Sequence, residues 1–402
     1  MKINTGKGSI TLWTLIAIWS VSAVTSLPGL AISPILGELN NIFPKASDLE
    51  IQMLTSLPSL LIIPFVLLAG HLSANRNKLA LLYTGLTIFF LSGVACLIAK
   101  SMTWLIIISC ILGIGAGMIV PLSTGLVVDY FTGDYRVRQL GYSSAINNLT
   151  LVAATSLTGY FADINWHYSF FVYLLPGISL LLALRLRNTP SAPEPKESDQ
   201  YKQSQINIRH LVMLTLFYFL ITYTVLVVTF DTSFLIERYK VHPDISGVII
   251  SLFFLAIMAP GLFLSHIIRR TRSYTNIISL CAVAIGLLCV GLFRNVGMLT
   301  LGITLAGLGY GVMQPLIYDK AAIIAPPQLA TKALSVVMSA NYLAIILCPF
   351  ILRLLQRIFH SHSLSFPFIS SAVVAILILV AAVIGRGNFV LGLDKSYYEQ
   401  SR

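Results

Sequence analysis

The sequence predicts an all-α membrane protein in which twelve transmembrane helices form two pseudo-symmetric bundles of six. Three observations support this fold class: an apolar composition, a series of long apolar runs, and a motif that recurs in both halves. Of the 402 residues, 56% are hydrophobic and 10% are charged, whereas soluble proteins carry about 25% charged residues. The mean hydropathy is +0.85. This composition excludes an ordinary soluble globular domain.

Twelve apolar runs are long enough to cross a bilayer, whose hydrocarbon core is spanned by about 20 helical residues. They cover residues 10–36, 51–70, 79–99, 103–128, 139–161, 168–187, 210–236, 245–268, 274–293, 296–318, 330–352 and 366–385. Residues 1–8 are interpreted as a short polar leader ahead of the first run.

The runs fall into two groups of six, separated by residues 188–207. This segment contains three prolines among small, polar and charged residues, a composition typical of a flexible linker. We therefore predict an N-terminal bundle over residues 1–187 and a linker over 188–207. A C-terminal bundle with a short tail follows over 208–402.

A glycine motif relates the two halves. Three glycines spaced two apart, with a proline four positions after the last, occur over residues 113–121 and again 194 positions later, over 307–315. Small residues at this spacing let a neighbouring helix backbone approach closely, and the proline bends the helix. A recurring bent helix indicates two equivalent halves around a shared central site, an arrangement typical of secondary transporters.

The distribution of Lys and Arg predicts the orientation. With the N-terminus placed in the cytoplasm, most of the 26 basic residues fall on the cytoplasmic side, and the exceptions are Lys45, Lys100, Arg238, Lys240, Arg294, Arg353 and Arg357. The positive-inside rule then predicts that both termini are cytoplasmic. The net charge of +11 therefore reflects membrane topology, and a nucleic-acid partner is not expected.

Four short motifs, in order along the first half, resemble the major facilitator superfamily. They are the loop between the second and third runs (70–78), the glycine motif with the loop that follows it (109–138), and the segments 159–163 and 166–170. The resemblance, mainly to bacterial efflux-type members, implies alternating access in a bacterial cytoplasmic membrane. It also implies gating roles for Gly70, Arg76, Asp129, Arg136 and Arg138.

The sequence departs from the family pattern at several positions. Ala74 replaces an aspartate in the loop between the second and third runs, and Ser109 replaces an arginine before the glycine motif. The usual acidic latch is therefore missing, and an arginine-based proton relay is not expected there. The fifth run keeps only Gly159 of the glycine-rich stretch typical of drug–proton antiporters, which weakens that assignment without excluding efflux.

Polar and aromatic side chains inside the apolar runs are the candidate substrate-binding residues. They are Tyr218, Tyr223, Gln314, Tyr318, Asn147 and Asn341. Such a lining suits amphipathic or weakly cationic organic molecules better than sugars or polyanions. For the two asparagines, hydrogen bonding between helices is the slightly favoured alternative.

Two acids in the second half are candidates for proton coupling, because a carboxylate within a membrane span is costly. Asp319 lies at the position equivalent to Gly125, and Asp231 lies late in the seventh run. The alternative for Asp231 is an interfacial acid near the outer end of the seventh run. The alternative for Asp319 is an acid at the cytoplasmic end of its helix, paired with Lys320 or Lys332.

No motif for catalysis, ATP use or metal binding is recognised. The sequence contains no phosphate-cradling loop, no Gly-x-Ser-x-Gly elbow and no His-Glu-x-x-His pair, so neither an enzyme nor a cofactor or metal is expected. The five cysteines lie in apolar runs and are expected to be buried thiols. We predict a monomeric transporter that exports a small drug or metabolite, coupled to protons. Nutrient uptake, a non-transporting sensor and a passive channel are the alternatives.

Overall fold

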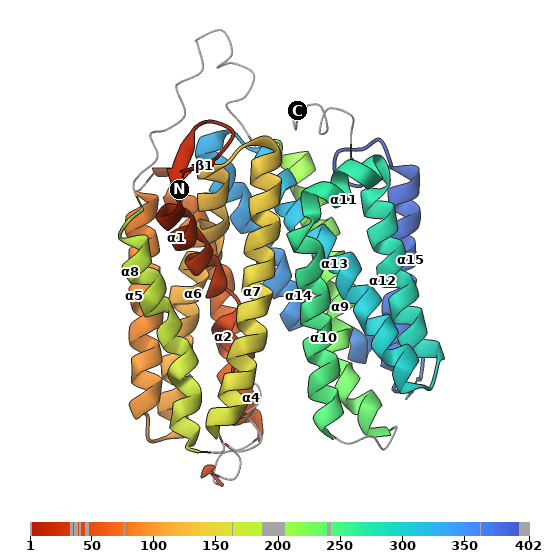
Figure 1. The fold of residues 1–402 in the computed structure, drawn as a ribbon. Helices are drawn as coiled ribbons and strands as arrows, with labels where there is room; N and C mark the ends of the chain where they lie inside the picture. The colour runs from red at the N-terminus through yellow and green to blue at the C-terminus, as the bar shows by residue number, and fades with distance from the viewer. Residues whose placement is uncertain are drawn as a thin grey trace. The chain divides into compact units, whose positions relative to one another are not determined.

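The computed structural model describes residues 2–32, 35, 39, 42–44, 48–75, 77–162, 164–186, 206–238, 243–361 and 363–393 (Figure 1). Arg76 and almost all of the predicted linker therefore lie outside the described residues. Among the described residues, the regular elements are helices apart from one small hairpin of strands β1 (Lys2–Asn4) and β2 (Ser9–Thr11).

The helices of the first half of the chain are α1 (Leu12–Ala23), α2 (Leu27–Leu30), α4 (Asp48–Asn75), α5 (Lys78–Ile98), α6 (Met102–Tyr130), α7 (Gly133–Ala162), η2 (Trp166–Leu174) and α8 (Leu175–Ala183). Those of the second half are α9 (Ile208–Arg238), α10 (Pro243–Leu262), α11 (Leu264–Thr271), η3 (Arg272–Tyr274), α12 (Thr275–Leu292), α13 (Val296–Ile324), η4 (Pro327–Leu329), α14 (Ala330–Ile358) and α15 (Phe366–Ile384).

These helices match the twelve predicted apolar runs. Among the described residues, nine helical stretches are long and apolar enough to cross a membrane, and two shorter apolar helices lie at Leu12–Ala23 and Ser251–Leu262. The remaining run, residues 139–161, corresponds to α7, which is 30 residues long but more polar. Large apolar side chains such as Leu181 (69% exposed) and Ile384 (83%) point outward, as expected for surfaces that face lipid. The predicted all-α membrane fold is thus confirmed.

The residues pack into two compact units. The N-terminal unit comprises Met1–Thr132, Ile146–Ile206 and Ala321–Tyr342, and the C-terminal unit comprises Gly133–Ala145, Asn207–Lys320 and Leu343–Arg402. The first turns of α7 therefore pack with the C-terminal unit, and part of α14 packs with the N-terminal unit.

In the N-terminal unit, the glycine motif places α6 directly against two neighbouring helix backbones. A Cβ atom on Gly113 would lie 2.7 Å from the carbonyl oxygen of Pro58 in α4, and one on Gly115 would lie 2.8 Å from that of Gly85 in α5. Both distances are too short for a side-chain carbon, so larger residues would force the helices apart.

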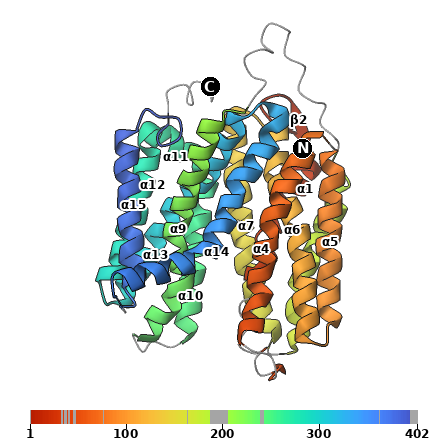
Figure 2. The same ribbon diagram turned by 180° about the vertical axis from the view of Figure 1, so that it is seen from behind.

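The C-terminal unit repeats this packing with equivalent residues. A Cβ atom on Gly307 would lie 2.8 Å from the carbonyl oxygen of Phe253 in α10, and Gly309 lies closely against the Ser279 carbonyl in α12. Ser279 is 194 positions after Gly85, the same offset as the motif itself. The close helix contacts predicted from the glycine repeat are therefore present in both units (Figure 2 shows α12 and α13 of the C-terminal unit from behind).

The short polar leader predicted ahead of the first run is folded: residues 2–8 form most of a β-hairpin with the start of that run. Lys2 pairs with Thr11 and Asn4 pairs with Ser9. The Thr5 amide donates to the Gly8 carbonyl at 2.9 Å, and Gly6 has φ 86°. A glycine with positive φ at the first position of a two-residue turn suits hairpin twist, so the hairpin follows from local turn chemistry.

The loop predicted after the second run is also shorter than expected. Helix α4 continues to Asn75, so Gly70 is helical. The next helix then begins at once, because the Asn77 side chain accepts hydrogen bonds from the amides of Leu79 and Ala80. An asparagine at this N-cap position satisfies amides that a helix start leaves free.

Candidate functional site

A buried ion pair joins α7 and α13 inside the C-terminal unit. Arg136 Nε donates to Asp319 Oδ1 at 2.5 Å, and the two side chains are 16% and 1% exposed. Arg136 lies in the first turn of α7, which begins at Gly133 with φ 54°. The structure thus unites a predicted gating residue with a predicted proton-coupling acid.

Arg136 was not among the partners that the sequence suggested for Asp319, which were Lys320 and Lys332. Lys320 Nζ donates to two backbone carbonyls, those of Val390 and Gly392, while Arg136 forms an ion pair with Asp319. The physical reason is helical geometry: consecutive residues point about 100° apart around the axis, so Asp319 and Lys320 meet different neighbours.

The ion pair has no charged counterpart at the equivalent place in the N-terminal unit. The position equivalent to Asp319 is Gly125, where a Cβ atom would lie 2.6 Å from Oγ1 of Thr331. Thr331 is fully buried and lies one position beyond the equivalent of Arg136. One unit therefore carries a glycine–threonine contact where the other carries two opposite charges.

A cluster of phenols occupies the interior of the C-terminal unit. The hydroxyl of Tyr218 lies 2.8 Å from that of Tyr318 and 3.4 Å from that of Tyr310. Gln314 Nε2 donates to the Tyr218 hydroxyl at 3.2 Å. Tyr218 is fully buried, and its ring meets that of Tyr318 edge to face with centroids 5.6 Å apart. We call Tyr218, Thr222, Tyr310, Gln314 and Tyr318 the phenol cluster.

Three members of this network were missed by the sequence reasoning: Thr222, Tyr310 and Ser144. The Thr222 hydroxyl lies 3.3 Å from that of Tyr310, and the Ser144 hydroxyl donates to Gln314 Oε1 at 3.4 Å. Helical spacing could have found two of them, since Tyr310 lies four residues before Gln314 and Thr222 lies four after Tyr218. Residues four apart share a helix face.

The cluster offers a ligand several groups that both donate and accept hydrogen bonds, together with aromatic faces. Tyrosine and threonine hydroxyls can reverse their hydrogen bonds, and a glutamine amide presents both a donor and an acceptor. Phenol rings also attract organic cations through their faces. The cluster can therefore exchange its internal hydrogen bonds for hydrogen bonds to a polar organic molecule. Because its members are uncharged, this exchange leaves no unpaired ionic group.

The remaining predicted binding residues lie elsewhere. Asn147 and Asn341 belong to the N-terminal unit, where Asn147 Nδ2 donates to the Ser26 hydroxyl at 2.7 Å. Tyr223 is 3% exposed and lies five residues beyond Tyr218, which places it about 140° further around α9. Asp231 is partly buried near the end of α9 and has no hydrogen-bond or ion-pair partner among the residues that the structure describes.

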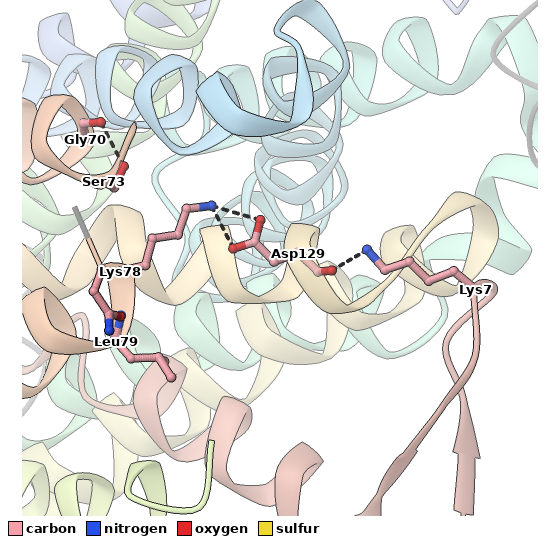
Figure 3. A network of polar contacts seen from close by, with 7 residues as sticks. Lys7, Gly70, Ser73, Lys78, Leu79 and Asp129 are labelled. Carbon is pink, nitrogen blue, oxygen red and sulfur yellow. Dashed lines mark hydrogen bonds and ion pairs between the residues drawn. The ribbon is translucent and has the colours of Figure 1, made fainter. Parts of the chain in front are cut away.

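A second ion pair closes one end of the N-terminal unit. Lys78 Nζ lies 2.8 Å and 3.0 Å from the two carboxylate oxygens of Asp129, and Lys7 at the hairpin tip donates to the Asp129 backbone carbonyl (Figure 3). The Thr132 amide also donates to the Thr5 carbonyl at 3.0 Å. Lys78 is therefore the basic partner of Asp129 among the described residues of this loop.

The other predicted gating residues make weaker or purely steric contacts. Arg138 lies 4.0 Å from Asp134, which Arg269 of α11 approaches more closely, at 2.6 Å. Gly70 packs directly against the side chain of Ser335 in α14. In the described part of the chain no three His, Cys, Asp or Glu side chains gather as a metal site would require.

Comparison with known proteins places this architecture in a family. The family model of the Major Facilitator Superfamily matches residues 14–349 and 212–391. The multidrug transporter protein MdtP of Bacillus subtilis is 30% identical over 165 residues, which are 41% of this chain and 29% of that protein. The quinolone resistance protein NorA of Staphylococcus aureus is 26% identical over 164 residues, covering 40% and 42% respectively. The matches thus span less than half of the length of these relatives.

Solved structures agree on the fold. The human organic anion transporter MFSD10 (TETRAN) superposes with a TM-score of 0.71 at 17% identity, over 92% of this chain and 97% of that chain. The proton:xylose symporter XylE superposes with a TM-score of 0.73 at 14% identity, over 95% and 96%. The chain is therefore a membrane transporter of the Major Facilitator Superfamily.

Proposed function

We propose that this transporter exports small amphipathic or weakly cationic organic molecules by alternating access, driven by protons that enter in exchange. The observation that carries the proposal is the juxtaposition, on α13, of the buried Asp319–Arg136 ion pair with the phenol cluster. A titratable group and a polar aromatic surface then lie on one helix, so that movement of this helix can affect both.

The substrate class follows from the chemistry of the phenol cluster. Its members carry hydroxyls, one amide and aromatic rings but no net charge, which favours organic molecules with few hydrogen-bonding groups and a delocalised or partial positive charge. The printed names of the relatives, a multidrug transporter and a quinolone resistance protein, agree with export of such compounds. We propose Tyr218, Gln314 and Tyr318 as binding residues, with Tyr223, Asn147 and Asn341 as further candidates.

Proton coupling would depend on whether the Asp319 carboxylate is paired with the Arg136 guanidinium. A carboxylate out of water stays ionised only when a positive charge or several donors compensate it. If a conformational change separates Asp319 from Arg136, the Asp319 carboxylate loses its positive partner. Binding a proton then neutralises the carboxylate instead. The membrane potential supplies about 2.3 kcal/mol per charge for each 100 mV, enough to drive one such step. Asp231 is the second candidate acid.

The remaining parts of the proposal concern topology and gating. The bundles 1–187 and 208–402, joined by the linker 188–207, would rock around the site in a bacterial cytoplasmic membrane, with both termini in the cytoplasm and one chain as the working unit. Gly70, Arg76, Asp129, Arg136 and Arg138 would control the cytoplasmic gate. The Lys78–Asp129 pair supports this role, because it ties the ends of two helices together.

Transport by purified protein in liposomes tests the proposal. An imposed pH gradient should drive accumulation of ethidium, an amphipathic fluorescent cation, and of a quinolone. Asp319→Asn should abolish gradient-driven transport but retain exchange of labelled for unlabelled compound, and Asp319→Glu should restore part of the gradient response. Full gradient-driven activity in Asp319→Asn, in Asp231→Asn and in the double variant would refute proton coupling through these acids.

A further inference from the structure

Lys320 is a buried lysine whose ammonium is bound by backbone rather than by an acid. Its side chain is 1% exposed, and Nζ donates to the carbonyl oxygen of Val390 at 3.0 Å and to that of Gly392 at 2.6 Å. The ring of Phe389 lies 5.9 Å from the same nitrogen. A buried ammonium is costly unless several acceptors compensate it, so these carbonyls hold Lys320 firmly in one place.

The carbonyls belong to a compact segment after α15, which we call the C-terminal loop (residues 385–393). Asn388 organises this loop: its side chain accepts from the Val390 amide at 2.9 Å, and its carbonyl accepts from the Gly392 amide at 2.8 Å. Asn276 of α12, which is fully buried, donates to the Leu391 carbonyl at 2.8 Å. The loop is thus fastened to α12 and α13, with Val390 fully buried.

The place of Lys320 in the sequence connects this loop to the candidate coupling acid. Lys320 directly follows Asp319 on α13, so whatever fixes the Lys320 side chain also fixes the backbone that carries Asp319. An apolar residue of similar length could fill the same space without the cost of a buried charge. A lysine is favoured if the site must hold carbonyl oxygens at a defined distance, because an ammonium donates up to three hydrogen bonds.

We propose that Lys320 is a positioning residue for Asp319. By binding the C-terminal loop, Lys320 fixes this turn of α13 so that the Asp319 carboxylate meets Arg136. The inference rests on the proposed coupling role of Asp319, which its own variant tests separately.

Two glycines of the loop offer a matched pair of substitutions. One should displace the loop without touching Lys320, and the other is its control. A Cβ atom at Gly392 would collide with the Arg386 carbonyl, whereas one at Gly387 would meet nothing within 4 Å. Gly392→Ala should therefore displace the loop without altering α13, and Gly387→Ala should leave it in place. Lys320→Met removes the ammonium while keeping a similar side-chain length.

Two readouts follow in full-length protein. A cysteine introduced as Val390→Cys, in a variant whose five native cysteines are replaced, should be protected from a thiol reagent and become reactive after Lys320→Met or Gly392→Ala. In liposomes, both substitutions should lower gradient-driven ethidium transport by about tenfold or more, the order expected for lost hydrogen bonds to a charged group. Exchange of labelled for unlabelled ethidium should persist, and Gly387→Ala should match the parent protein.

Three results would overturn the inference. Continued protection of the cysteine after Lys320→Met would show that Lys320 does not hold the loop. Reactivity could rise without any change in gradient-driven transport, or both transport modes could fall together as the protein unfolds. If Asp319→Asn itself keeps gradient-driven transport, the proposed coupling role of Asp319 fails instead, and the labelling result still reports whether Lys320 holds the loop.

Discussion

The Arg136–Asp319 ion pair makes a quantitative prediction about stability. We consider Arg136→Gln, Asp319→Asn and the double variant. Removing one partner of a fully buried pair costs about 3–5 kcal/mol, because an uncompensated charge remains. The two partners are not equally buried, since Asp319 is 1% exposed and Arg136 is 16% exposed, so the two single variants should differ.

Arg136→Gln removes the ion-pair partner of the more deeply buried charge and should cost about 3 kcal/mol, at the low end of that range. Asp319→Asn leaves a guanidinium that still reaches solvent and should cost about half as much, roughly 1.5 kcal/mol. The double variant should be less unstable than the sum of the singles by about 1–3 kcal/mol, as for other contacting residues.

Thermal unfolding of detergent-solubilised protein, followed by tryptophan fluorescence, measures these differences. For a chain of this size, each kcal/mol corresponds to roughly 1–2 °C, so Arg136→Gln should lower Tm by about 3–6 °C and Asp319→Asn by about half of that. Arg138→Gln is the matched control on the same helix: its side chain is 45% exposed and its acid is 4.0 Å away, so it should change stability by under about 0.5 kcal/mol.

The reasoning would be refuted by strict additivity of the two single substitutions, or by a larger loss in Asp319→Asn than in Arg136→Gln. Additivity would mean that the charges do not depend on one another. The reversed order would mean that the charge of Arg136, rather than that of Asp319, is the one that is destabilised more when its partner is removed.

Three further predictions use the same thermal assay. Gly113→Ala should destabilise the protein by about 1–3 kcal/mol, because the new Cβ would press on Pro58, whereas Gly8→Ala, which meets nothing within 4 Å, should be nearly neutral; equal effects would contradict the close packing. Lys78→Ala should cost about 1–2 kcal/mol by leaving the Asp129 carboxylate without its ion-pair partner, and Lys78→Arg should recover most of it. Tyr218→Phe should cost about 1–3 kcal/mol, because neighbouring buried hydroxyls lose a partner, and no change would argue against the cluster as a connected network.

Much of the architecture could be predicted from the sequence, because a bilayer imposes simple rules on it. Apolar runs of fixed length had to become helices, and glycines two apart on α6 and α13 had to face neighbouring backbones. In the structure, the same offset of 194 residues also relates two neighbours of the motifs, Gly85 and Ser279. These inferences needed only local pattern and repetition.

The pairing of the polar groups could not be predicted in the same way. Arg136 and Asp319 are separated by 183 residues, and nothing in the neighbourhood of either residue points to the other. Lys320 beside Asp319 resembled a local charge pair, yet its acceptors are main-chain carbonyls 70 and 72 residues away. Because every residue has such a carbonyl, no pattern of side chains marks the ones that will be used.

The hairpin at the start of the chain has a consequence for biosynthesis. Its tip is anchored to Asp129 and Thr132, at the end of α6, which are synthesised after the three membrane helices that precede α6. Strands β1 and β2 therefore cannot make these contacts until the end of α6 has been synthesised. The hairpin residues therefore reach their final contacts only after more than a hundred later residues have been synthesised.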